Sequence, residues 1–149
     1  LTTGQDNTFI GDKAGMLNAD GGSNTFVGAN AGDANTSGSR NAFFGHRSGD
    51  ANTSGASNVF LGYYSGAANT TESNNLFIGQ EAGRYATVTN NTLIGYQSGM
   101  GDGTTAPTGT DNTFVGYQTG LVNTTGYSNT FLGDSAGDAN TTGYENTRT

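Results

Sequence analysis

Hydrophobic residues in this chain occur as adjacent pairs that recur at nearly equal intervals. Each pair lies close behind an Asn and directly before a Gly, and polar stretches rich in Asn, Thr, Ser and Gly separate the pairs. The spacings between successive units are 17, 17, 17, 17, 16, 21 and 17 residues. Self-similarity at a fixed short period is typical of solenoids. The units begin at residues 7, 24, 41, 58, 75, 91, 112 and 129.

Each unit predicts one coil of a parallel β-solenoid. It is too short for a helix pair, and its Gly and β-branched content disfavours helix. The segment N-T-F-I-G reads as a strand bounded by Gly, a second short strand is expected over [AS]-G-x-x-N, and N-T-[ST]-G reads as a turn. Stacked at about 4.8 Å, eight coils give a rod roughly 40 Å long. The fold class is therefore all-β, a β-roll of about eight 17-residue coils.

The same register covers the whole chain, so residues 1–149 are expected to form one repeat domain. Residues 1–6 fit the end of a unit, and residues 146–149 begin another, with Arg148 where Phe is expected. We expect the chain to be a fragment of a longer fibrous protein.

The apolar pair predicts an interface. Adjacent strand residues point to opposite faces, so one of the two columns faces inward and the other outward. A single-chain solenoid would then expose an apolar ladder, which is typical of an association surface. The alternative is a wider monomeric solenoid with an internal kink. The candidate core and interface residues are Phe9, Ile10, Phe26, Val27, Phe43, Phe44, Phe60, Leu61, Phe77, Ile78, Leu93, Ile94, Phe114, Val115, Phe131 and Leu132.

Two columns of Asn are expected to stack from coil to coil. One runs from Asn7 to Asn129 without a gap, and a less complete one includes Asn35, Asn52 and Asn69. Stacked Asn side chains hydrogen-bond along a ladder of strands. We assign both columns a structural role.

The composition and net charge of the chain disfavour disorder and several classes of binding partner. Hydrophobic residues make up 32 % of the chain and 26 of 149 residues are Gly, yet only 11 % are charged and the aromatic residues are periodic, which argues against disorder. The net charge of −7 disfavours nucleic acid and anionic membranes as partners. Cysteine is absent, which excludes disulfides, and no apolar run has the length of a transmembrane helix.

Catalytic patterns are missing, so we expect no enzyme activity and no cofactor. The single His, His46, occupies a variable turn position, and no carboxylates pair as in a hydrolase. Asp33, Asp50 and Asp138 share a column and are weak candidates for a Ca²⁺ site, with solvated surface charge as the default.

Two features are candidate ligand contacts. Tyr63, Tyr64, Tyr96 and Tyr117 follow the unit Gly, where their rings can stack on sugars or simply pack in the turn. The sixth unit carries a four-residue insertion near residues 100–111, either a binding protrusion or a tolerated loop.

The pattern resembles the head repeat of trimeric autotransporter adhesins. The matching residues are N-T-F-[IVL]-G at 7–11, 112–116 and 129–133, the small residue at Ala14, and the later Gly at Gly38 and Gly126. This chain departs from the family in its period, 17 residues against about 14, and in its bulky Phe column. The resemblance implies a left-handed parallel β-roll that forms a homotrimer around the apolar face, as in similar phage tail-fibre rolls.

These observations predict a structural, adhesive segment of a trimeric surface adhesin or tail fibre. It would lie outside the cell or on a virion or injection-machine fibre, and would attach to a host glycan or protein receptor. A carbohydrate-binding module is the alternative. An ice-binding solenoid is disfavoured because Ala42, Val59 and Leu76 interrupt its Thr column.

Overall fold

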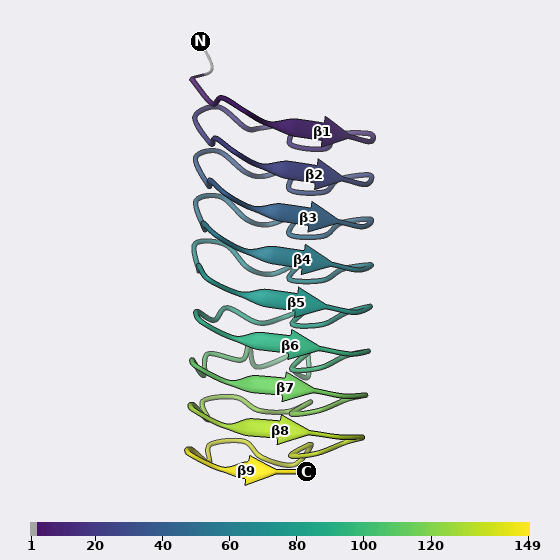
Figure 1. Ribbon diagram of the computed structural model, residues 1–149, viewed down its shortest axis with the longest axis vertical. Coiled ribbons are helices and arrows are strands. Elements are labelled where there is room, and N and C mark those ends of the chain that lie inside the picture. The colour runs from purple at the N-terminus through teal and green to yellow at the C-terminus, as the bar shows by residue number, and fades with distance from the viewer. Residues whose placement is uncertain (1–2) are drawn as a thin grey trace.

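The computed structural model describes residues 3–149 as a stack of coils with one short strand in each (Figure 1). Neighbouring strands pair in parallel and in sequence order, with equivalent residues side by side. The predicted parallel β-solenoid is confirmed, and the described residues form no helix that could cross a membrane. The strands are β1 (Thr8–Ile10), β2 (Thr25–Val27), β3 (Ala42–Phe44), β4 (Val59–Leu61), β5 (Leu76–Ile78), β6 (Thr92–Ile94), β7 (Thr113–Val115), β8 (Thr130–Leu132) and β9 (Thr147–Arg148).

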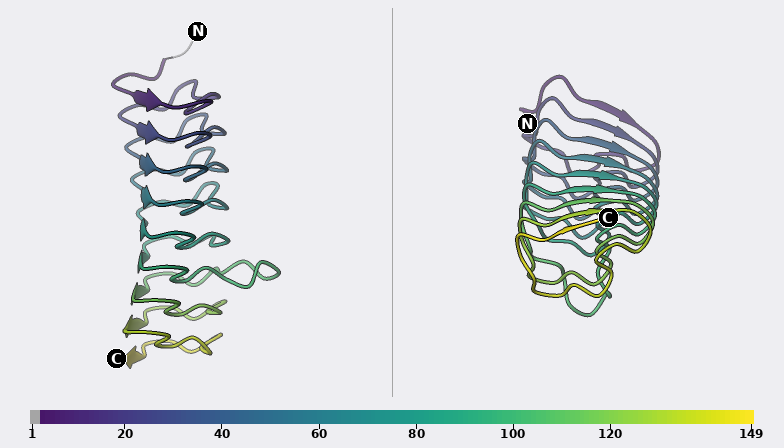
Figure 2. Two further views of the ribbon diagram at one scale, coloured as in Figure 1. Left: turned by 90° about the vertical axis from the view of Figure 1, so that its right-hand side faces the viewer. Right: turned by 60° about the horizontal axis from the view of Figure 1, so that its bottom comes forward.

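The coils wind in a left-handed sense, as the resemblance implied. In Figure 1 the strands run from left to right on the near side, and the chain returns behind them one level lower. Figure 2 shows the strands gathered on one side of the rod and the turns on the other. The insertion of the sixth coil projects from the turn side, away from the strands.

Each coil contains one strand rather than two, so the predicted second strand over [AS]-G-x-x-N is wrong. In the fourth coil this segment covers residues 65–69, where Gly66 has φ 60°, and Tyr64 directly before it has φ 55°; both values belong to the left-handed region and not to a strand. The segment still bonds from coil to coil, because the N–H of Gly66 donates to the carbonyl of Ala82 at 3.0 Å. A chain of turns therefore fills the place of the second strand.

A stack of Phe rings fills the interior. The first residue of each apolar pair points inward, and neighbouring rings lie 4.7–5.0 Å apart between centroids. The predicted interstrand rise is thereby confirmed. Leu93 takes the Phe position in the sixth coil and is also buried. The fully buried members of the column are Phe26, Phe43, Phe60, Phe77, Phe114 and Phe131.

The two glycine columns are explained by close approach. At Gly62, with φ 142°, a Cβ would lie 2.3 Å from the carbonyl oxygen of Gly79 in the next coil. At Gly66 a Cβ would lie 2.6 Å from the ring of Phe60. A side chain at either position would collide with backbone or core, and the φ values favour Gly as well.

The Asn columns form the expected ladders. In the first column, the backbone N–H of Asn58 donates to Oδ1 of Asn41, and its own Nδ2 donates to the carbonyl of Glu72. In the second column, Nδ2 of Asn52 donates to Oδ1 of Asn35. Except near the break in the second column described next, these buried amides satisfy one another from coil to coil, which makes the polar interior tolerable.

The second ladder breaks where the fifth coil has Ala86 in place of Asn. Both amide atoms of Asn69 and Oδ1 of Asn52 are buried without a hydrogen-bond partner among the described residues. At the break, a small pocket of about 10 Å³ borders Ala86 and Asn123. This volume is close to the smallest that holds one water.

Phe60→Ala is expected to lower the free energy of unfolding by about 3–5 kcal/mol, because it leaves a cavity in the ring stack. Leu61→Ala, at the next residue, should cost less than about 1 kcal/mol in a monomeric sample, since the side chain faces outward. Urea unfolding followed by circular dichroism measures both. Equal costs in a monomeric sample would contradict the inward and outward assignment.

Asn58→Ala is expected to cost about 1–3 kcal/mol, because it leaves the buried N–H of Asn75 and the carbonyl of Glu72 without partners. Asn69→Ala removes a buried amide that already lacks partners, so its cost should stay below about 1 kcal/mol. The same unfolding measurement compares the two. A larger loss for Asn69→Ala would show that this amide is bonded after all.

Candidate functional site

The outer face of the sheet, here called the strand face, is a regular surface that runs along the rod. The first and third residue of each strand point outward, because the middle residue points into the core. Leu61 is 45 % exposed and Leu132 is 53 % exposed. The first column consists of Thr8, Thr25, Ala42, Val59, Leu76, Thr92, Thr113 and Thr130, and the second consists of Ile10, Val27, Phe44, Leu61, Ile78, Ile94, Val115 and Leu132.

No charged residue occurs in these two columns of eight. The second column is a continuous apolar ladder whose side chains are exposed or half-buried, which is characteristic of an association surface. The geometry thus divides the sequence-predicted interface set in two: the Phe column belongs to the core, whereas the second apolar column lies outside. The outward Thr side chains belong to this same face, and three coils in the middle of the rod lack them.

The Tyr candidates do not form one site. Tyr63, Tyr96 and Tyr117 occupy the turn position directly after the unit Gly and are exposed, and His46 precedes them at the same position. His46 stacks on Tyr63 at 5.5 Å and Tyr96 stacks on Tyr117 at 5.4 Å between ring centroids. Because stacked rings cover each other's faces, this column presents mainly ring edges to solvent. It offers a poor platform for the apolar face of a sugar.

Tyr64, one position further along, lies in a stack of alternating aromatic rings and guanidinium groups. The guanidinium carbon of Arg47 is 4.9 Å from the centroid of its ring, and that of Arg84 is 4.5 Å away. Arg84 also lies 5.0 Å from the ring of Tyr85. Such cation–π contacts hold the guanidinium groups in place. We call Arg47, Tyr64, Arg84 and Tyr85 the Arg–Tyr stack.

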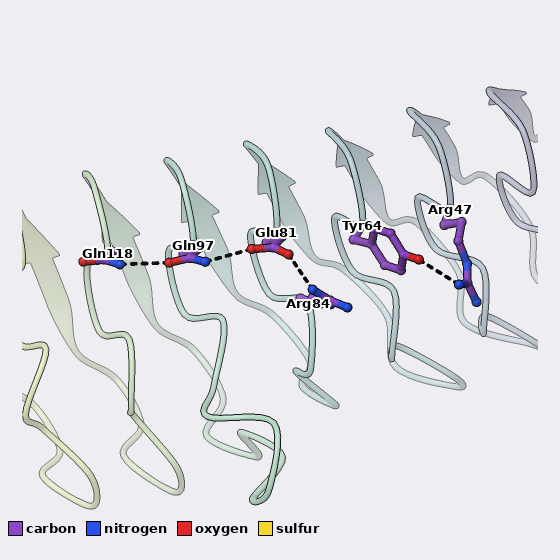
Figure 3. Close-up of polar contacts among 6 residues, drawn as sticks. All are labelled: Arg47, Tyr64, Glu81, Arg84, Gln97 and Gln118. Carbon is purple, nitrogen blue, oxygen red and sulfur yellow. Dashed lines mark hydrogen bonds and ion pairs between the residues drawn. The ribbon is translucent and has the colours of Figure 1, made fainter.

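A row of polar side chains continues from this stack along the rod (Figure 3). Nη1 of Arg47 donates to the hydroxyl of Tyr64, and Arg84 pairs with Glu81. Gln97 donates to Glu81, and Gln118 donates to Gln97, each at 2.8 Å. The row occupies one turn position of five successive coils, with Arg84 reaching in from three residues further along.

Arg47 also pairs with Asp50, at 2.7 Å between Nε and Oδ2. Burial raises the pKa of Asp50, although the hydrogen bond from Arg47 acts in the opposite direction. The hydrogen bonds to Asp50 and Tyr64 raise the pKa of Arg47. The ion pair therefore keeps Arg47 charged, but it does not fully offset the effect of burial on the pKa of Asp50.

The weak metal candidates are not brought together. Asp33 and Asp50 lie in neighbouring coils, whereas Asp138 lies five coils beyond Asp50. Among residues 3–149 no cluster of three or more His, Asp or Glu side chains is arranged to hold a metal ion. Asp50 already forms an ion pair with Arg47.

The insertion near residues 100–111 forms an ordered protrusion. Oδ1 of Asp102 accepts hydrogen bonds from the N–H groups of Thr104 and Thr105, and these bonds lower the pKa of its carboxyl. A Cβ at Gly103 would lie 3.3 Å from the ring of Tyr85, so this part of the protrusion lies close to the Arg–Tyr stack.

Sequence reasoning did not identify Arg84 and Tyr85 as candidate functional residues, and it did not connect them with Arg47. The two Arg residues occupy different columns of the repeat, so comparison column by column could not pair them. One signal was present: the chain has only five basic residues, and these two lie two coils apart.

Comparison with known proteins adds no family assignment. No protein-family model matches the chain, and no curated protein or solved structure is significantly similar to it.

Asp50→Asn is expected to leave the thermal midpoint at pH 7 unchanged or raised. Because the folded chain raises the pKa of this carboxyl, the folded state holds the proton more tightly than the unfolded state does. Ionisation of this carboxyl therefore lowers the free energy of unfolding as the pH rises above about 3.9, the pKa of an Asp side chain in the unfolded state. Melting curves between about pH 3 and pH 7 compare wild type and variant. A variant midpoint that is lower at pH 7 but not at pH 3 would contradict this sign.

Proposed function

We propose that this chain is a rod segment of a fibrous attachment protein, such as a surface adhesin or a tail fibre, and that it assembles through its strand face. The observation that carries the proposal is the uncharged apolar ladder, which continues through all eight coils. A stable monomer rarely leaves such a surface uncovered.

The partner that fits this face best is another copy of the chain. The ridges of the ladder repeat at the interstrand distance of about 4.8 Å. A second ladder matches them over the full length only if it has the same period, which another copy provides. Rotational symmetry about an axis parallel to the rod lets every copy bury the same face. The resemblance to trimeric adhesin heads favours three copies.

In that assembly the turn side of each copy faces outward and is free for attachment. The protrusion of the sixth coil and the Arg–Tyr stack both belong to turns (Figures 2 and 3). We assign this side the contact with a host glycan or protein receptor, outside the cell or on a virion. The role is structural and adhesive, without catalysis.

A carbohydrate-binding module is the second candidate. The stacked Tyr column does not favour it, since the ring faces of Tyr96 and Tyr117 cover each other. The Arg–Tyr stack does, because guanidinium and aromatic groups there adjoin an open depression.

Light scattering of the purified chain tests the assembly. We expect three times the chain mass of 15.1 kDa for the wild type. The double variant Leu61→Asp/Ile78→Asp places charges on the strand face in neighbouring coils and should give the single-chain mass with an unchanged circular dichroism spectrum.

The matched control is Thr125→Asp/Thr142→Asp, which adds the same charge at exposed turn positions of neighbouring coils and should keep the wild-type mass. A wild type that remains a single chain at about 100 µM, far above a micromolar dissociation constant, would refute the proposal.

A further inference from the structure

An open depression of about 270 Å³ lies beside the Arg–Tyr stack, with Ala67 and Ala68 also in its lining. Its walls come from three successive coils, the third, fourth and fifth. Arg47 and Arg84, two of the chain's five basic residues, both border it, together with one acidic residue, Asp50. The chain has a net charge of −7 and few basic residues, so two guanidinium groups at one place are unusual on its surface.

We propose that this depression binds a carboxylate-bearing sugar residue, such as a uronic acid, with Arg47 and Arg84 on its border supplying the positive charge and the N–H donors for the ligand. This proposal names the kind of ligand that the attachment role proposed above would use. Its biological meaning rests on that role, whereas the binding itself does not.

The two ion pairs are oriented to favour an anion from solvent. The side chains of Asp50 and Glu81 are each only 13 % exposed, whereas those of Arg47 and Arg84 are 44 % and 29 % exposed. The guanidinium groups are thus the more exposed partner of each ion pair, although the carboxylate of Asp50 also lines the depression. Glu81 is not part of the lining.

Both guanidinium groups retain donors for a ligand. Arg47 uses Nε for Asp50 and Nη1 for Tyr64, and Arg84 uses Nη1 for Glu81. Within residues 3–149, Nη2 of Arg47 and both Nε and Nη2 of Arg84 make no hydrogen bond. The planar fork of a guanidinium matches a carboxylate in shape and charge.

The rest of the depression suits a sugar ring. Ala67 and Ala68 contribute apolar lining. The hydroxyl of Tyr64 accepts a hydrogen bond from Arg47, so its own hydrogen is available to a sugar oxygen. The volume lies just below the range of about 300–1,000 Å³ that drug-sized ligands occupy. One sugar residue fits this size better than a longer ligand held in one place.

The geometry is held before any ligand arrives. Cation–π contacts fix both guanidinium groups against Tyr64, and Gly103 of the protrusion packs against Tyr85. Preorganised donors lose less entropy on binding. A single site this open should bind weakly, with a millimolar dissociation constant, and several copies on one rod would gain through avidity.

The test is a ligand-detected NMR titration of the intact chain with glucuronate, with glucose, acetate and N-acetylaspartate as comparison ligands. We expect saturable binding of glucuronate, no binding of glucose, and at least tenfold weaker binding of acetate and N-acetylaspartate. Arg47→Gln and Arg84→Gln should each weaken glucuronate binding at least tenfold. Arg40→Gln, which removes an exposed guanidinium elsewhere, should leave binding unchanged.

Arg47→Lys is a second variant that keeps the positive charge next to Asp50, so it is less liable to disturb the fold. It lacks the planar guanidinium fork and should therefore also weaken glucuronate binding. Absence of saturable binding, an equal effect of Arg40→Gln, or equal or tighter binding of acetate or N-acetylaspartate would overturn the proposal. The titration is repeated on Leu61→Asp/Ile78→Asp. Glucuronate binding per chain should persist there, so a failure of assembly and a failure of this site are separable.

Discussion

Stacking of each residue on its equivalent in the next coil is the interaction on which the whole structure depends. Phe rings lie 4.7–5.0 Å apart, buried Asn amides bond to one another, and backbone N–H groups of one coil donate to carbonyls of the next. A single coil has almost no core of its own. It becomes stable only because its neighbours cover it, as in other repeat proteins.

The same constraint creates the strand face. If every coil must repeat its neighbour, then whatever points outward in one coil points outward in all of them. An apolar residue after Phe60 is an isolated exposed side chain in one coil, but its equivalents from Ile10 to Leu132 form a ladder. The rod therefore turns a local pattern into a long surface. In our account further copies of the chain cover that surface, which leaves the turn side for attachment.

The period, the parallel register and the inward or outward alternation were predictable from the sequence, because they follow from equal spacing and strand geometry. The second strand was not, since whether Tyr64 and Gly66 take left-handed or extended backbone depends on the next coil. The Arg–Tyr stack also escaped prediction, because Arg47 and Arg84 occupy different columns and reach the same ring, that of Tyr64, only through the winding of the coils. The residues that depart from the repeat are the ones that sequence periodicity describes least. In this chain they also surround the depression that we assign to a ligand.

Thiol labelling tests the central claim, that the strand face is buried between copies, most directly. The chain has no cysteine, so Leu61→Cys reports on one outward position alone, and Thr125→Cys reports on an exposed turn. Leu61 is 45 % exposed in a single chain, and a lone rod should label at both positions at similar rates. Our account predicts that Leu61→Cys reacts with a maleimide at least ten times more slowly than Thr125→Cys. Equal rates in the folded protein would contradict it.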